Sequence, residues 1–129
     1  MAQKSAVRTD KAPAPFQGAP YSQAIRVGDL VFVSGQIALA PGTTAMRGAT
    51  IQEQTEQVFA NLRAILEAAG SGLDRLVKTT VFLRNLGDFA GMNDVYRRHV
   101  GNVPPARSTV EASNLPGGAL VEIEAIAHL

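Results

Sequence analysis

The chain has 129 residues, a length that suits one compact domain with an apolar core of its own. Its 12 basic and 11 acidic side chains leave a net charge of +1, which does not favour nucleic acid as a partner. Cysteine is absent, which excludes disulfides and thiolate chemistry. No apolar stretch is long enough for a membrane span, and no hydrophobic segment follows the first charge as in a secretory signal. We therefore expect a soluble cytoplasmic protein without a membrane partner.

The first segment of the chain has little periodicity. Residues 1–18 contain Pro13 and Pro15 and predict a loosely structured lead-in, with a single domain over residues 19–129. Two strands are then expected, over Tyr21–Val27 and Leu30–Ile37. The two residues between them begin with glycine, and this spacing predicts a β-hairpin.

A long amphipathic helix is expected next. Thr50 and Glu53 have the spacing of a capping box, and Gly70 is a suitable residue for the end of the helix. Between them, five apolar residues recur at helical spacing: Val58, Leu62, Ile65, Leu66 and Ala69. The strand predicted over Leu76–Leu83 carries Val77, Thr79, Val81 and Leu83 on one face.

A second helix is expected from an N-cap at Asp88 to about His99, with an apolar stripe formed by Phe89, Met92, Tyr96 and Val100. The last strands are expected over Arg107–Ala112 and Leu120–Ala127. The order is then ββαβαββ, in which two helices cover only one face of a sheet. Leu30–Val33 is apolar on both faces, so the opposite face also needs a cover. We expect other copies of the chain to cover it, as in a homo-oligomer, and the alternative is one loop folded over that face.

Several kinds of chemistry have no support in the sequence. His99 and His128 are the only histidines, and no cluster has the spacing of a metal site. The glycine patterns of phosphate-binding and dinucleotide-binding loops are incomplete or absent. We therefore expect no metal and no cofactor.

Charged residues on the last two strands are the sharpest candidates for a site. A guanidinium matches a carboxylate with two parallel hydrogen bonds, so Arg107 either binds a ligand or pairs with Glu111, Glu122 or Glu124. The sequence leaves these alternatives balanced. Glu122 and Glu124 share one strand face, and the commoner interpretation is an edge strand whose charges face water.

Three further residues are candidates for a pocket. Asn93 lies beside the apolar stripe of the second helix, where an amide needs hydrogen-bond partners from a neighbouring loop or a ligand. Tyr21 begins a strand directly after a proline, and Ser34 ends an apolar run beside Gly35. Each of these residues is also ordinary at its position.

Together these stretches resemble the Rid family of reactive-intermediate deaminases, also called the YjgF family and historically labelled L-PSP endoribonucleases. The resemblance runs in order from about residue 19 to the end. The matching stretches are Ala19–Ala24, Ser34–Ile37, Val77–Phe82, Phe89 through Asn93 to Tyr96, Pro105–Ser108 and Val121–Ala127.

The resemblance implies an α+β fold like that of the small chorismate mutases, with a mixed sheet and two helices on one face. It also implies a homotrimer with a ligand cleft at each subunit interface. The archetypal members hydrolyse enamines and imines, such as 2-aminoacrylate and its tautomer 2-iminopropionate, to a 2-keto acid and ammonia.

The family pattern also implies roles for single residues. Arg107 matches the arginine that binds the substrate carboxylate, and Glu122 matches the acidic residue near the attacking water. Tyr21, Ser34 and Asn93 match pocket residues. The chain departs from the pattern at Thr109, where archetypal members carry a cysteine, and at Phe16–Ala19, where they carry Ile-Gly.

These inferences lead to the hypothesis of an imine hydrolase that needs no metal or cofactor. Arg107 and Glu122 are the catalytic candidates, and Tyr21, Ser34, Asn93, Arg107 and Thr109 bind the substrate. The alternatives are a deaminase for 2-aminomuconate or a similar 2-amino enoate, and a trimer that binds ligands without catalysis. An endoribonuclease is a third alternative, which the net charge of +1 does not favour.

Overall fold

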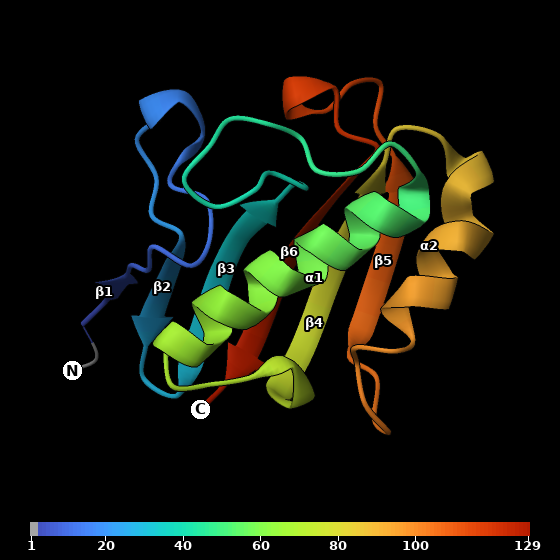
Figure 1. The fold of residues 1–129 in the computed structure, drawn as a ribbon. Helices are drawn as coiled ribbons and strands as arrows, with labels where there is room; N and C mark the ends of the chain where they lie inside the picture. The colour runs from blue at the N-terminus through green and yellow to red at the C-terminus, as the bar shows by residue number, and fades with distance from the viewer. Residues whose placement is uncertain (1–2) are drawn as a thin grey trace.

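The computed structural model describes residues 3–129, which form one six-stranded sheet with two α-helices (Figure 1). Across the sheet the strand order is β1-β2-β3-β6-β4-β5. The elements are β1 Ser5–Val7, β2 Ala24–Val27, β3 Leu30–Gln36, α1 Ile51–Ala68, β4 Leu76–Leu83, α2 Phe89–Tyr96, β5 Ala106–Glu111 and β6 Val121–His128. All neighbouring strands are antiparallel except β4 and β5, which α2 connects as parallel strands.

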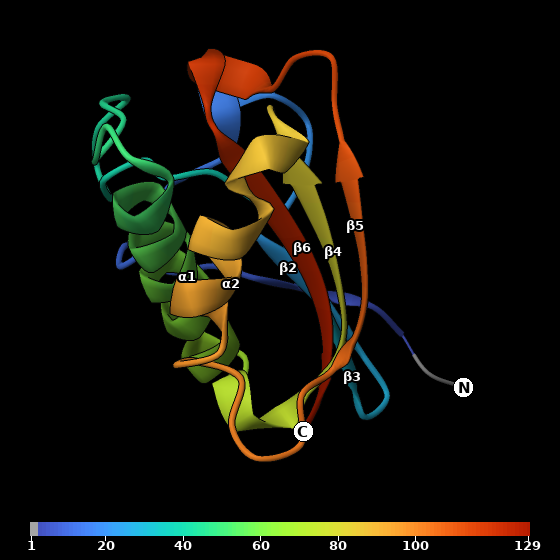
Figure 2. The same ribbon diagram turned by 90° about the vertical axis from the view of Figure 1, so that its right-hand side faces the viewer.

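Both helices lie on the same face of the sheet, as Figure 2 shows with the sheet seen from its edge. This arrangement confirms the predicted α+β class with a mixed sheet and two helices on one face. The core lies between the helices and the sheet, and all five apolar residues of the predicted stripe on α1 are buried there. The capping box is confirmed: Thr50 accepts from the N–H of Glu53, whose carboxylate accepts from the N–H of Thr50.

Two details of the predicted elements are wrong. The face predicted for β4 is correct for Thr79, Val81 and Leu83, but Val77 is 45% exposed and Leu76 is buried in its place. The register of β4 against β6 shifts between Leu76 and Lys78, and this irregularity reverses which residue faces the core. The second helix is also shorter than predicted, since α2 ends at Tyr96, and Phe89 at its start is 42% exposed.

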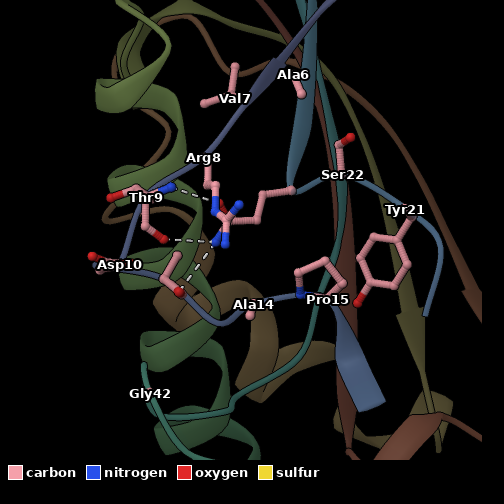
Figure 3. Close-up of a pocket in the computed structure, with 12 residues that line it drawn as sticks. Ala6, Val7, Arg8, Thr9, Asp10, Ala14, Pro15, Tyr21, Ser22 and Gly42 are labelled. Carbon is pink, nitrogen blue, oxygen red and sulfur yellow. Dashed lines mark hydrogen bonds between the residues drawn. The ribbon is translucent and has the colours of Figure 1, made fainter. Parts of the chain in front are cut away.

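The expectation of a loosely structured lead-in is wrong for the described residues. Strand β1 pairs antiparallel with β2, and Val7 and Ala12 belong to the main core. The buried side chain of Gln23 secures this segment: it accepts from the N–H of Thr9 and donates to the carbonyls of Thr9, Ala12 and Pro13. Figure 3 shows the hollow that results, with Thr9 on one side and Tyr21 on the other.

The opposite face of the sheet carries no helix of the described chain. Leu30, Phe32 and Val110 are 39%, 41% and 44% exposed on this face. Such a set of large apolar side chains favours contact with another surface. The predicted homotrimer remains a prediction at this point. Neither helix of the described chain has the length and apolar character needed to cross a membrane.

Candidate functional site

The predicted site residues fall into two groups on opposite faces of the sheet. Arg107 on β5 pairs with the buried Thr79 of β4, so its side chain lies on the helix-covered face. Glu122 on β6 pairs with Phe82. Because residues 79 and 82 of β4 are separated by an odd number of positions, Glu122 lies on the face without helices.

On the helix-covered face, Arg107 lines a hollow between α2, β5 and the loop that precedes β5. Its Nη1 donates a hydrogen bond of 2.8 Å to Oδ1 of Asn93. The guanidinium carbon lies 4.7 Å from the ring centroid of Tyr96 and 5.4 Å from that of Phe89, both within cation–π range. The guanidinium is thereby oriented while several of its N–H donors stay available to a ligand.

The structure contradicts the salt-bridge alternatives for Arg107. Within residues 3–129, no carboxylate lies within 4.0 Å of its guanidinium, so Glu111, Glu122 and Glu124 are not its partners. The interpretation of the Glu122 strand as an edge strand is also wrong, because β6 lies between β3 and β4. The partner of Asn93 is the Arg107 side chain and not a loop backbone group.

Tyr96 is itself fixed in place by buried contacts that the sequence analysis missed. Its hydroxyl shares a hydrogen bond of 2.6 Å with the Thr79 hydroxyl, and its ring packs edge-on against Phe59 of α1 at 5.4 Å. The helical spacing placed Tyr96 on a buried stripe, but no pattern in the sequence indicated that its ring face supports an arginine.

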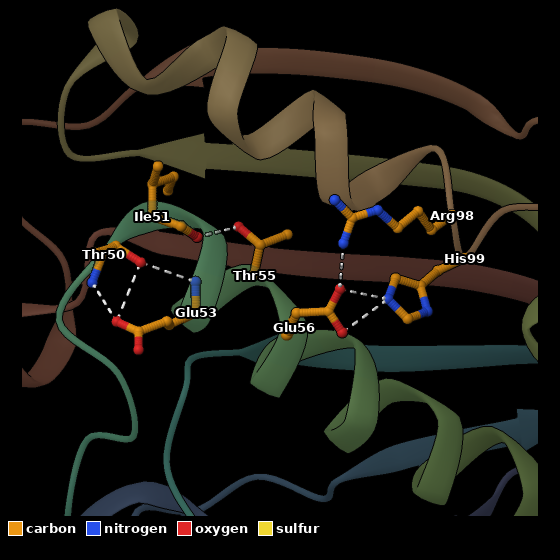
Figure 4. A network of polar contacts seen from close by, with 7 residues as sticks. All are labelled: Thr50, Ile51, Glu53, Thr55, Glu56, Arg98 and His99. Carbon is orange, nitrogen blue, oxygen red and sulfur yellow. Dashed lines mark hydrogen bonds and ion pairs between the residues drawn. The ribbon is translucent and has the colours of Figure 1, made fainter.

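A second contact joins the two helices near the end of α2 (Figure 4). Glu56 of α1 forms an ion pair with the guanidinium of Arg98 at 3.6 Å and contacts Nε2 of His99 at 3.2 Å. The His99 ring stacks on Phe59 at 4.8 Å. These contacts hold α2 against α1 and so position the residues of α2 that contact Arg107.

On the other face, Tyr21, Ser34 and Glu122 line one hollow together with Gly35. The phenol oxygen of Tyr21 accepts from the N–H of Phe16 at 2.5 Å. The Ser34 hydroxyl donates to the carbonyl of Ser22 at 2.6 Å, which leaves its lone pairs available to a ligand.

Glu122 occupies space that the absence of a side chain at Gly35 provides. A Cβ at position 35 would lie only 2.9 Å from Cδ of Glu122. Burial, with a smaller contribution from the charge of Glu124, raises the pKa of Glu122 above its usual 4.5. A carboxyl group with a raised pKa exchanges protons more readily near neutral pH.

Thr109 lies outside both groups. It shares the helix-covered side of β5 with Arg107 but lines neither hollow. Its Oγ1 is buried and is the only buried side-chain polar atom without a hydrogen-bond partner in the part of the chain that the structure describes. Its role in substrate binding stays a prediction.

The structure therefore brings Arg107 and Asn93 together, and separately Tyr21, Ser34 and Glu122, but a sheet lies between the groups. Among the described residues, no group of three or more His, Asp or Glu side chains could hold a metal ion. One hollow offers an oriented cation and the other a carboxyl group with nearby hydroxyls, a combination suited to a carboxylate substrate and an acid–base reaction.

Known proteins resemble the chain over nearly its whole length. The family model described as Endoribonuclease L-PSP matches residues 9–129. A RutC family protein of Pyrococcus abyssi is 50% identical over 125 residues, covering 97% of each chain. A 2-iminobutanoate/2-iminopropanoate deaminase of Dermatophagoides farinae is 41% identical, covering 98% of this chain and 97% of that protein.

A solved structure agrees with these sequence matches. The crystal structure of RidA from an Antarctic Psychrobacter species superposes with a TM-score of 0.92 at 43% identity, covering 97% of this chain and 99% of that one. The predicted resemblance is thereby confirmed, and the chain belongs to the Rid/YjgF family that the Endoribonuclease L-PSP model describes.

Proposed function

We propose that the protein hydrolyses 2-imino acids, the tautomers of 2-amino enoates, to 2-keto acids and ammonia. The observation that carries this proposal is the guanidinium of Arg107, which Asn93 and Tyr96 orient and which contacts no carboxylate in the described chain. A cation held in this way is suited to a substrate carboxylate. The relative from Dermatophagoides farinae, which is named 2-iminobutanoate/2-iminopropanoate deaminase, supports the same reaction class.

In the proposed reaction, water adds to the imine carbon. Glu122 accepts a proton from the water as the C–O bond forms, and the electrons of the C=N double bond move to nitrogen. Glu122 returns this proton to the nitrogen, which gives an amine beside the new hydroxyl. A second transfer through Glu122 moves the hydroxyl proton to the amine, so that the C–N bond breaks, ammonia leaves and a carbonyl remains. The raised pKa of Glu122 suits a group that first accepts and then returns a proton.

A shared cleft is part of the proposal. Arg107 and Glu122 lie on opposite faces of one sheet, so one substrate reaches both groups when they come from two copies of the chain. The uncovered face, with Leu30, Phe32 and Val110, supports packing between copies. We propose the homotrimer as this assembly and the cytoplasm as its location.

The first experiment measures imine decay. 2-Iminopropanoate is generated from alanine by an amino-acid oxidase, and its decay is followed with wild type, Arg107→Ala and Arg107→Lys. We expect wild type to accelerate the decay and Arg107→Ala to lose most of this effect. Wild type without any acceleration would refute the proposed reaction, whereas a fully active Arg107→Ala would refute only the assignment of Arg107.

Mixed assemblies test the shared cleft. We expect chains carrying Arg107→Ala and chains carrying Glu122→Gln to be inactive alone. When the two are co-expressed and assemble at random, about a quarter of the interfaces combine both native residues. We expect partial recovery of activity in the mixture. No recovery from mixed assemblies, or light scattering at the single-chain mass of 13.6 kDa, would contradict the interface model.

A further inference from the structure

The hollow beside Arg107 contains a second arginine. Arg97 follows directly after the last residue of α2 and lines the same hollow as Arg107, Asn93 and Tyr96. Among residues 3–129, no acidic residue lines this hollow. We infer that the site prefers 2-imino acids with a second carboxylate, 2-imino dicarboxylates, and that Arg97 binds this second group. This inference rests on the proposed function and narrows its substrate class.

The charge of Arg97 has no partner in the described chain. No carboxylate that the structure describes lies within 4.0 Å of its guanidinium, including that of Asp94 on the preceding turn of α2. The neighbouring Arg98 differs, because it pairs with Glu56 at 3.6 Å and does not line the hollow. Of these two consecutive arginines, Arg98 thus joins the helices and Arg97 lies beside the candidate site.

A simpler interpretation is that Arg97 stabilises the C-terminal end of α2, where cations are favourable. This interpretation applies equally to Arg98 and does not explain why one of the two lines the hollow. In addition, two arginines that line one hollow make its charge positive, which favours a ligand with more than one negative charge. A single substrate carboxylate at Arg107 satisfies one of these charges, and a second carboxylate satisfies both.

Three imines separate charge from size. The imine of glutamate presents a second carboxylate. The imine of glutamine presents an amide of nearly the same shape, and the imine of alanine has neither group. With wild type, we expect kcat/KM for the glutamate imine to exceed that for the glutamine imine about 10-fold, equivalent to about 1.4 kcal/mol. Arg97→Ala should remove this difference and leave the glutamine and alanine imines within about 2-fold of wild type.

Arg98→Ala is the matched control, because it removes the same charge one residue away. We expect it to keep the preference for the glutamate imine. Arg97→Glu should reverse the preference. An equal effect of Arg97→Ala on the glutamate and glutamine imines would overturn the inference, as would a change in oligomeric mass, since Arg97 would then serve contacts between copies.

A binding measurement makes the test independent of turnover. Calorimetry compares 2-oxoglutarate with its neutral amide, 2-oxoglutaramate, on wild type and Arg97→Ala. We expect wild type to bind the dicarboxylate more tightly and Arg97→Ala to bind both alike. A wild type that hydrolyses no imine yet shows this binding pattern would refute the proposed reaction while supporting the charge preference, and equal binding by wild type would refute the preference alone.

Discussion

Replacing Gly35 by alanine tests whether the position of Glu122 matters for catalysis. Gly35 lies where the register of β3 against β6 shifts, and its φ is not positive, so alanine fits the backbone. The added Cβ would lie 2.9 Å from Cδ and 3.1 Å from Cγ of Glu122, and closer still to Oε2. The conflict is therefore with the end of a side chain that can rotate, and not with backbone.

These distances give the expected size of the changes in stability and in kcat. To reach ordinary contact at 3.4 Å, Cδ of Glu122 must move by about 0.5 Å, and its carboxylate oxygen must move further. A strained side-chain rotamer costs about 0.5–1.5 kcal/mol. Reduced freedom of the unfolded chain returns about 0.4–1 kcal/mol. We expect the free energy of unfolding to change by less than about 1 kcal/mol, while a misplacement approaching 1 Å lowers kcat up to about 100-fold.

Two assays separate these effects. Urea unfolding measures stability, and decay of 2-iminopropanoate measures catalysis. The double variant Gly35→Ala/Glu122→Gln is the control. Once the carboxylate of residue 122 is gone, its displacement should lower kcat no further than Glu122→Gln alone does. Native kcat in Gly35→Ala would refute the role of Glu122, and a loss of several kcal/mol in stability would refute the argument that the conflict is relieved by rotation.

Three further predictions concern groups of the candidate site. Burial and the charge of Glu124 raise the pKa of Glu122, so the folded state binds the proton of this carboxyl group more tightly than the unfolded state does. At a pH above the raised pKa, the charged carboxylate therefore lowers the stability of the fold. Glu122→Gln should thus stabilise the fold at neutral pH but not below pH 4.5 in urea unfolding, and wild-type activity should fall as the pH drops through the raised pKa. Asn93→Asp should pair with Arg107 and weaken pyruvate binding at least about 10-fold, measured by calorimetry, whereas intact binding would contradict the free guanidinium. Thr79→Val leaves the buried Tyr96 hydroxyl unpaired and should cost about 1–3 kcal/mol in urea unfolding, a cost that adding Tyr96→Phe should largely remove.

Local patterns in the sequence predicted the elements whose causes are local. The capping box and apolar stripe of α1 depend on residues three or four positions apart, and both are present in the structure. Strand β1 has only three residues, and its order depends on pairing with β2 and on the distant Gln23. The irregularity at Val77 likewise depends on the register against β6. Neither feature has a signature in neighbouring residues.

The same distinction applies to the candidate site. The family resemblance named Arg107 and Asn93, but spacing alone did not show that the two side chains bond to each other. Tyr96 was indicated only as a buried residue, although its ring lies 4.7 Å from the guanidinium carbon. Arg97 has the appearance of an ordinary helix-end cation, and its place in the hollow depends on how α2 packs beside β5.

Strand alternation gives a physical reason for the proposed division of the site between two chains. Side chains of a strand alternate between faces, so the register that pairs Arg107 with Thr79 and Glu122 with Phe82 assigns the two groups to opposite sides. Rotating either side chain does not carry it through a hydrogen-bonded sheet. An acid moved one position along β6 would instead enter the core, because Val121 and Ile123 are fully buried. If both groups act on one substrate, the second copy of the chain is therefore a structural requirement of the reaction.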